Sequence, residues 1–101
     1  MINQLVLVGN LTTKPKIKNN KTIITIAIPR NLENKNHEKD YIDVVLLSEL
    51  SKAICDYCNI GDLIGVKGRI KTTINKEQKK KKTEIIAEKI TLLKRKENIN
   101  E

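Results

Sequence analysis

The hydrophobic positions of this chain form five strand-like segments and one helical segment. Before the helix, apolar residues gather at residues 2–11, 22–30 and 41–47. In the second of these segments Ile24, Ile26 and Ile28 alternate with Thr25 and Ala27, which is the period of a β-strand. The middle of the first segment is continuously apolar, which is typical of a strand buried on both faces.

The period changes after residue 47. Apolar residues then recur three and four positions apart, at Leu50, Ala53, Ile54, Tyr57 and Cys58. This spacing predicts a helix over residues 49–59. Ser48 is suited to cap its N-terminus, and Gly61 is suited to end it in a left-handed conformation. We expect Leu50, Ile54 and Tyr57 to cover one end of a barrel.

The segment that follows the helix, residues 61–72, combines a basic side with an apolar side. Lys67, Arg69 and Lys71 alternate along it and should share one face. The opposite face carries Ile64, Val66 and Ile70. Its three glycines are costly inside a strand unless the backbone bends or is approached closely. The segment therefore predicts a curved strand with one face in a core and a cationic face for a polyanion.

The remaining segments complete a small barrel. Residues 12–21 are interpreted as an irregular connection or short edge strand that ends in a turn at Asn19-Asn20. Residues 75–82 are interpreted as the tip of a hairpin and residues 83–93 as the last strand. Three strands, a helix and two strands is the order of an all-β, five-stranded OB-fold Greek-key barrel with one α-helix between the third and fourth strands.

The charge balance favours an anionic partner. Lysine and arginine total 20 against 12 acidic residues, which gives a net charge of +8 in 101 residues. Such an excess favours nucleic acid, although an AT-rich genome also produces a lysine-rich composition. The adjacent lysines Lys79–Lys82 repel one another and should stay in water. They form either an arm that clamps phosphates or a solvated hairpin tip.

No motif in the chain supports catalysis, a metal or a cofactor. Cys55 and Cys58 form a C-x-x-C pair, but a zinc site needs two further ligands, and the pair falls late in the predicted helix. His37 is the only histidine, and no nucleophile or third member accompanies it. We therefore expect a protein that is not an enzyme and binds no cofactor or metal.

The sequence also favours a cytoplasmic location. The first residues carry no basic lead or long apolar run, and no window approaches 18 apolar residues. Without a secretory signal the two cysteines should be reduced thiols, and no membrane partner is expected.

Four stretches of the chain resemble the bacterial single-stranded DNA-binding protein family. They are residues 1–12 (MINQLVLVGNLT), 25–28 (TIAI), 40–45 (DYIDVV) and 61–72 (GDLIGVKGRIKT). The resemblance implies an OB-fold that assembles through its first strand into a dimer or tetramer and wraps single-stranded DNA. It divides the chain into an OB-fold single-stranded DNA-binding domain at 1–93 and a short disordered polar tail at 94–101.

The chain departs from the family at its stacking residues. The family usually places aromatic side chains near four positions, which are here Leu32, Tyr41, Leu47 and Asn75. Only Tyr41 is aromatic. Asp43 and Glu49 lie close to where the family often has basic groups. The family's flexible linker and acidic C-terminal tip have no counterpart, so recruitment of partners by a tail is not expected.

These observations predict binding of single-stranded DNA with little sequence specificity, mainly through basic residues, in replication, recombination or mobile-element maintenance. Tyr41 is expected to stack on one base, with Leu32 and Leu47 in apolar contact. Phosphates are expected to meet Lys14, Lys16, Lys18, Lys67, Arg69, Lys71, Lys79, Lys80, Lys81 and Lys82. Affinity that depends on cations should fall steeply with salt.

A second interpretation stays open at this point. The chain also resembles a primosomal-type protein-interaction module of OB fold, for which nucleic-acid binding is weak or secondary. Its partner would then be a replication or mobile-element protein. RNA is open as a ligand too, because nothing in the sequence reads a 2′-hydroxyl.

Overall fold

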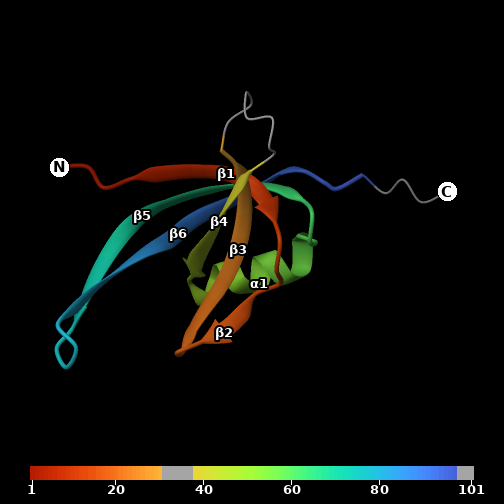
Figure 1. Ribbon diagram of the computed structural model, residues 1–101. Helices are drawn as coiled ribbons and strands as arrows, with labels where there is room; N and C mark the ends of the chain where they lie inside the picture. Colours follow the sequence, from red (N-terminus) through yellow and green to blue (C-terminus); the bar gives the residue numbers. More distant parts are fainter. Residues whose placement is uncertain (31–37, 98–101) are drawn as a thin grey trace.

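The computed structural model describes residues 1–30 and 38–97, which form one curved sheet and one helix (Figure 1). The elements in chain order are β1 (Leu5–Leu11), β2 (Lys16–Lys18), β3 (Lys21–Pro29), β4 (Lys39–Leu46), α1 (Ser48–Tyr57), β5 (Leu63–Asn75) and β6 (Lys80–Lys94). The chain is therefore mostly β with one helix in its described part, as the hydrophobic pattern predicts.

The sheet curves round so that β1 pairs with strands on both of its sides. Its strand order is β1-β5-β6-β4-β3-β2, all pairs being antiparallel except β4–β6, and β1 pairs in addition with β3. β1 passes from β5 to β3 at Gly9 and Asn10. A Cβ atom on Gly9 would lie 2.5 Å from the carbonyl oxygen of Ala27, so only glycine allows this approach.

The expected number of strands is wrong by one. The described part contains six strands, because Lys16–Lys18 forms the short strand β2 within the segment interpreted as a connection or edge strand. Asn19 and Asn20 both have positive φ, at 52° and 62°, and join β2 to β3 in a two-residue hairpin turn. The predicted turn is thus confirmed, and the helix lies between the fourth and fifth strands once β2 is counted.

The core is aliphatic and lies inside this circuit of strands. Its buried members are Leu11, Ile24, Ile26, Val44, Leu46, Ile54, Ile64, Val66 and Ala87. The alternation predicted for β3 and β4 is confirmed in their middle parts, where every second residue is buried: Ile24, Ile26, Val44 and Leu46. It does not extend to the end of β3, where Ala27 is buried and Ile28 is only partly buried. Burial of each large aliphatic side chain contributes about 1.5–3 kcal/mol.

Two expectations about burial are wrong. Ile70 was expected on the core face of β5 but is 46% exposed. It lies where β5 and β6 extend as a two-stranded hairpin beyond the rest of the sheet (Figure 1), so no further layer covers it. Val6 and Val8 of β1 are exposed as well, so β1 is buried on one face only in the single chain.

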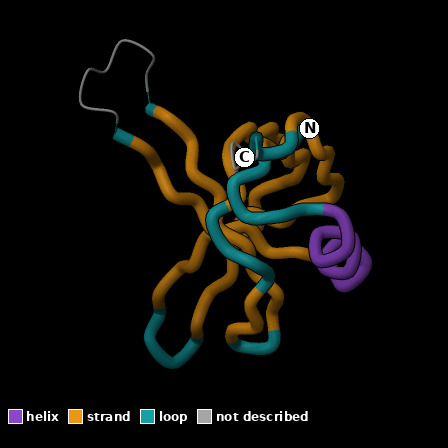
Figure 2. The backbone as a smooth tube through the Cα atoms, turned by 90° about the vertical axis from the view of Figure 1, so that its right-hand side faces the viewer, coloured by secondary structure: helices purple, strands orange, loops and turns teal. Residues whose placement is uncertain are grey.

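The helix differs from its prediction at both ends. It begins at Ser48, with Leu47 in the N-cap position and no side-chain cap, and it ends at Tyr57. Gly61, with φ of 99°, forms the turn into β5 instead, where its N–H donates to the Leu11 carbonyl at 2.7 Å. The helix lies beside one end of the sheet (Figure 2).

The helix uses less of its apolar stripe than predicted. Ile54 is its one buried residue in the structure, and Leu50 packs against the core as a partly buried neighbour. Tyr57 is 67% exposed, so its expected place in the cover of the barrel end is wrong. α1 is also too short to cross a membrane, and no other helix occurs in the described residues.

The end of the molecule near the helix is tied by a buried carboxylate. Asp62 accepts hydrogen bonds from the backbone N–H groups of Lys96 at 2.8 Å and Asn59 at 2.9 Å. These two bonds hold the pKa of the Asp62 carboxyl below its usual value, against the effect of burial. Asp62 thus joins the start of β5 to the chain beyond β6.

Candidate nucleic-acid interface

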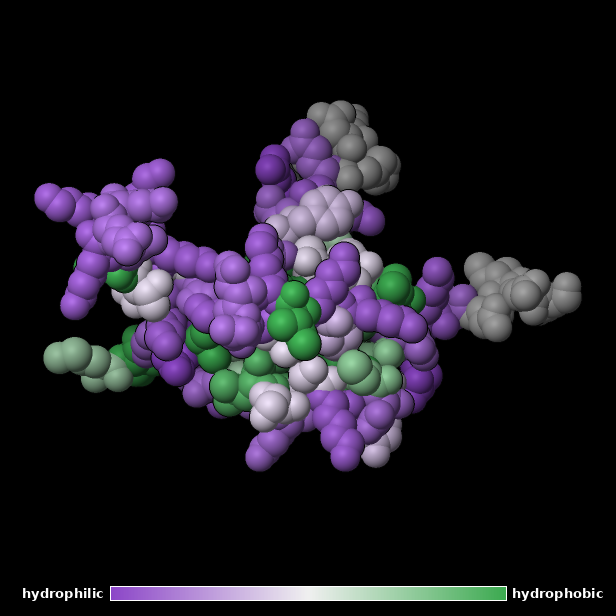
Figure 3. All heavy atoms as spheres, turned by 90° about the horizontal axis from the view of Figure 1, so that it is seen from below, coloured by the Kyte–Doolittle hydropathy of each residue, from purple (hydrophilic) through white to green (hydrophobic). Residues whose placement is uncertain are grey.

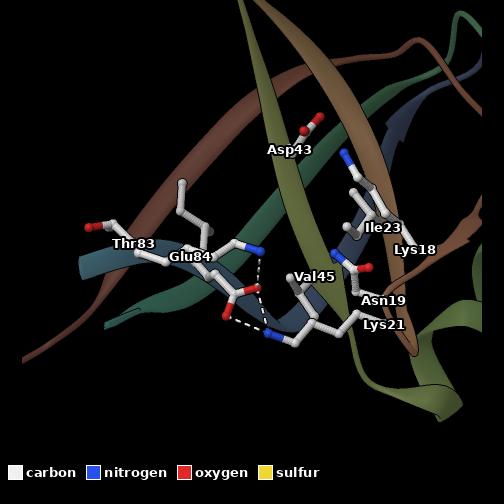
Figure 4. Close-up of a pocket in the computed structure, with 10 residues that line it drawn as sticks. Lys18, Asn19, Lys21, Ile23, Asp43, Val45, Thr83 and Glu84 are labelled. Atoms are coloured by element: carbon white, nitrogen blue, oxygen red, sulfur yellow. Dashed lines mark hydrogen bonds and ion pairs between the residues drawn. The ribbon is translucent and has the colours of Figure 1, made fainter. Parts of the chain in front are cut away.

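A groove runs over β2, β3, β4 and β6. It consists of two adjoining hollows of about 190 and 280 Å³ that share Lys18, Ile23 and Asp43. The first is completed by Asn19, Lys21, Val45, Lys82, Thr83, Glu84 and Ile85, and the second by Thr13, Lys16, Ile17 and Thr25. We call this surface the groove. Figure 4 shows its first hollow, with side chains from β2, β3, β4 and β6 converging on one space.

At one end of the groove, lysines surround a buried carboxylate. Glu84 of β6, whose side chain is 5% exposed, accepts two bonds from the Lys21 ammonium, at 2.6 and 2.8 Å (Figure 4). The Lys82 ammonium lies 3.8 Å from the same carboxylate. The hydrogen bond from Lys21 and the charges of Lys21, Lys82 and Lys71 hold the pKa of Glu84 below its usual value despite burial.

The middle of the groove carries a second carboxylate in a different setting. Asp43 of β4 is exposed, and its Oδ1 accepts a hydrogen bond of 2.6 Å from the Thr25 hydroxyl on β3. Ile23 and Val45 face each other across the same two strands and line the first hollow. The floor of the groove is therefore partly apolar, and its exposed acid, Asp43, is hydrogen-bonded to Thr25 on the neighbouring strand.

The predicted lysines of β2 lie on this groove. Lys16 and Lys18 are exposed and line it, while Lys14 lies exposed in the loop before β2. Pairing of Lys18 with Lys21 across the Asn19-Asn20 turn places the two ammonium-bearing residues side by side. Exposed lysines beside an apolar floor suit a polyanion whose phosphates lie at the rim.

The predicted basic arm, Lys79–Lys82, is only partly a loop. The turn comprises residues 76–79, and Lys80, Lys81 and Lys82 are strand residues that pair with Asn75, Ile74 and Thr73. Only Lys79, with φ of 52°, lies in the turn. All four are exposed, so the expectation that they stay in water is confirmed. Figure 3 shows the hairpin end, at the upper left, as mostly hydrophilic.

The predicted cations of β5 are distributed along the strand. Lys67 lines a hollow with Val6 and Val8, on the β1 side of the sheet. Arg69 lies 3.9 Å from Glu88, and Lys71 is paired in register with Glu84 at the end of the groove. A bulge follows Lys67, where β6 carries one extra residue. The three are exposed, but they face different neighbours.

The predicted stacking and apolar residues are partly placed. Tyr41 is 66% exposed and lies two residues before Asp43 on β4, hence on the same face of that strand. Leu47 is exposed at the start of α1. Leu32 and His37 lie outside the described residues.

Sequence reasoning missed Lys21, Ile23 and Thr25 as groove residues. Lys21 was reachable in principle, because a two-residue turn at Asn19-Asn20 places it opposite Lys18. The role of Glu84 had no sequence signal, because its contact with Lys21 spans 63 positions.

The two cysteines behave as ordinary thiols. Cys55 is exposed and Cys58 is partly buried, and both are free. Burial raises the pKa of the Cys58 thiol, and the nearby charge of Asp62 raises it further. Among residues 1–30 and 38–97 no group of three or more His, Cys, Asp or Glu side chains is arranged to hold a metal ion.

Comparison with known proteins identifies the family. The model of the single-strand binding protein family matches residues 2–93. The chain belongs to this family. A Staphylococcus aureus protein named single-stranded DNA-binding protein 2 is 33% identical, over 97% of this chain and 78% of its own length. An Enterococcus faecalis single-stranded DNA-binding protein is 34% identical over 92% of this chain. This chain spans about half, 55%, of the length of that protein.

The fold agrees with this membership. The crystal structure of a mitochondrial single-stranded DNA binding protein from S. cerevisiae matches with a TM-score of 0.70, at 14% identity, over 94% of this chain and 97% of that chain. The family consists of binding proteins, in agreement with the expectation that the chain is not an enzyme.

Proposed function

We propose that this chain binds single-stranded DNA with little sequence specificity and mainly through basic side chains. The observation that carries the proposal is the groove, in which lysines from three strands lie beside a floor that includes Ile23 and Val45. Family membership favours this function over the protein-interaction alternative.

Charge and burial suggest how a strand lies in the groove. Lys16, Lys18 and Lys82 are exposed at its rim and meet phosphates. Bases turn toward the apolar floor, and Tyr41 stacks on one of them from the same face of β4. Lys79–Lys81 extend the cationic surface along the hairpin and hold the strand where it leaves the groove.

The barrel and its assembly follow from β1. We take the circuit of β1, β3, β4, β5 and β6 to be the five-stranded Greek-key barrel of the OB fold, with β2 as an added edge strand. Copies associate as a dimer or tetramer through an apolar surface that we call the β1 face. It is lined by Val6, Val8, Gly65, Val66, Lys67, Lys89, Thr91 and Leu93. Exposed apolar patches of this kind commonly bind a partner.

The setting of the protein follows from the same assignment. The binding domain comprises residues 1–93, one residue short of the end of β6 at Lys94, and the sequence that follows is mostly polar. The protein acts in the cytoplasm, where Cys55 and Cys58 stay reduced, and serves DNA replication, recombination or mobile-element maintenance.

A titration tests the function. A fluorescent single strand and the corresponding duplex are titrated with the protein at several salt concentrations, with anisotropy as the readout. The single strand binds more tightly than the duplex, and log affinity falls with log salt by about 0.7 for each phosphate neutralised. Equal affinity for both forms, or no binding at low salt, contradicts the proposal.

A further inference from the structure

We propose that Asp43 reads the bases of a bound strand. It accepts hydrogen bonds from the amino groups of cytosine, adenine or guanine and so favours these bases over thymine. The inference rests on the function proposed above, and it adds a bias in base composition to a site that is otherwise tolerant of sequence.

The position of Asp43 determines which part of the strand it meets. It lines both hollows of the groove, together with Lys18 and the apolar side chain of Ile23. A carboxylate at this place repels phosphates, which move toward the lysines at the rim. The bases are then left to face Asp43.

The carboxylate is held in a fixed orientation. The Thr25 hydroxyl donates to its Oδ1 at 2.6 Å. Thr25 is itself fixed, because its N–H donates to the Thr13 hydroxyl at 3.1 Å and its carbonyl accepts from the Thr12 hydroxyl at 2.9 Å. The second oxygen of Asp43, Oδ2, has no hydrogen-bond partner within residues 1–30 and 38–97. A pre-oriented acceptor with one free oxygen is therefore present in the groove.

The other acid of the groove, Glu84, has no free acceptor oxygen of this kind. Both oxygens of Glu84 accept from Lys21, Lys82 lies next to it, and its side chain is 5% exposed. Glu84 thus fixes lysines, whereas Asp43 keeps acceptor capacity and exposure. The difference assigns base contact to Asp43 alone of the two.

The chemistry of the bases sets the direction of the bias. An ionised carboxylate only accepts hydrogen bonds. Cytosine N4, adenine N6 and guanine N2 are amino donors at the base edge. Thymine has a single edge donor, N3–H, and it lies between the acceptors O2 and O4, which repel a carboxylate. Tyr41 lies on the same face of β4, two residues or about 6.6 Å along the strand. A base that stacks on Tyr41 therefore has its edge within reach of Asp43.

The test compares oligo-dC and oligo-dT of equal length against wild type, Asp43→Ala and Asp43→Asn. The readout is the ratio of the two dissociation constants at one low salt concentration. Asp56→Asn is the control, because Asp56 is an exposed acid on α1 and carries the same charge. Circular dichroism confirms that each variant is folded.

We expect the dC-over-dT preference of wild type to exceed that of Asp43→Ala about three- to tenfold, the usual net contribution of one hydrogen bond. Asp43→Asn offers a donor to thymine O4, so its preference for dC falls at least as far. Loss of the negative charge raises the affinity for oligo-dT, whereas for oligo-dC the lost hydrogen bond offsets this gain. In Asp56→Asn the ratio equals that of wild type.

Two failures are distinguishable. If wild type binds both strands and all four proteins give the same ratio, Asp43 does not read bases while the proposed function stands. If wild type binds neither strand at low salt, the proposed function fails, and this inference fails with it.

Discussion

The groove and the β1 face are hollows of similar size on the same sheet, but they differ in chemistry. The hollows of the groove measure about 190 and 280 Å³, and that of the β1 face measures about 300 Å³. The groove combines lysines from three strands with Asp43 and Glu84. On the β1 face Val6, Val8 and Leu93 dominate, with Lys67 and Lys89 beside them.

The difference shows how one lysine-rich chain can separate two tasks. Net charge alone predicts a polyanion partner for the whole molecule. Pairing of the strands places acids among the lysines of the groove, where charges fix one another, and leaves valines exposed on β1. We therefore propose strand binding for the groove and self-association for the β1 face.

The largest expected effect comes from placing charge on the β1 face. Val6→Asp combined with Val8→Asp should convert the oligomer to a monomer, because burial of two carboxylates in an apolar interface is costly. Both side chains are exposed in the single chain, so the monomer should stay folded. Analytical ultracentrifugation measures the mass.

Ile17→Asp is the matched control for this experiment. Ile17 is an exposed apolar residue of β2 that lines the groove instead. It should leave the mass unchanged. An oligomer that survives the double valine variant, or one that Ile17→Asp dissociates, refutes the assignment of self-association to the β1 face.

The next effect concerns the lysines of the groove. Removal of Lys16, Lys18 and Lys82 together, each replaced by Ala, should lower the salt slope by about 2, at about 0.7 per lost phosphate contact. Affinity at moderate salt should fall on the order of 100-fold, at roughly fivefold per contact. Lys67→Ala with Lys89→Ala serves as control and should leave the slope unchanged. A salt slope that falls only in the control variant would indicate that the DNA binds at the β1 face instead of the groove.

A smaller effect is expected at the one candidate for stacking. Tyr41→Leu should weaken binding of single strands by about 1–3 kcal/mol, the usual contribution of one base stacked on an aromatic ring. Tyr57→Leu is the control, because Tyr57 lies on α1 and is 67% exposed, against 66% for Tyr41. Equal losses in both variants, measured by anisotropy, would exclude a stacking role for Tyr41.

The smallest effect concerns acid stability. The folded-state pKa of Glu84 lies below its ordinary value of 4.5, so its ion pair contributes stability that is present above that value. The contribution is lost as pH falls through the folded-state pKa. At pH 7 Glu84→Gln should therefore unfold at a lower urea concentration than wild type. Its free energy of unfolding should be smaller by about 1–2 kcal/mol. The difference in free energy of unfolding between wild type and Glu84→Gln should narrow toward pH 3.

Glu88→Gln provides the comparison for this prediction. Glu88 is exposed and lies 3.9 Å from Arg69, so its loss should change stability by less than about 1 kcal/mol. If the gap between wild type and Glu84→Gln stayed constant from pH 7 to pH 3, the ion pair would not be the source of the stability.

The sequence predicts the strands better than it predicts their surroundings. The alternation in β3 and β4 and the Asn19-Asn20 turn are local signals, and both are found in the structure. The prediction of Ser48 as N-cap failed because the helix already begins at Ser48, with Leu47 before it. The prediction for Gly61 failed because the chain leaves the helix at Cys58, and Gly61 instead bonds to Leu11 on β1. Tertiary contacts, which no local pattern encodes, decided the end of the helix.

The candidate site shows the same limit. Lys16, Lys18 and Lys82 were predicted from charge, and the structure brings them to one groove. Period two places Lys67 and Lys71 on one face, yet their neighbours are Val6 in one case and Glu84 in the other. Which strand lies beside each lysine depends on the sheet order, and that order is set by pairing between distant segments.

Lysine acetylation read by mass spectrometry tests the central claim most directly. The protein is labelled with and without a saturating mixed-sequence single strand, at one protein concentration. Lys16, Lys18 and Lys82 should become less reactive when the strand is bound, while Lys67 and Lys89 keep the reactivity they have without it. Protection of Lys67 and Lys89 with no change in the groove would contradict the account.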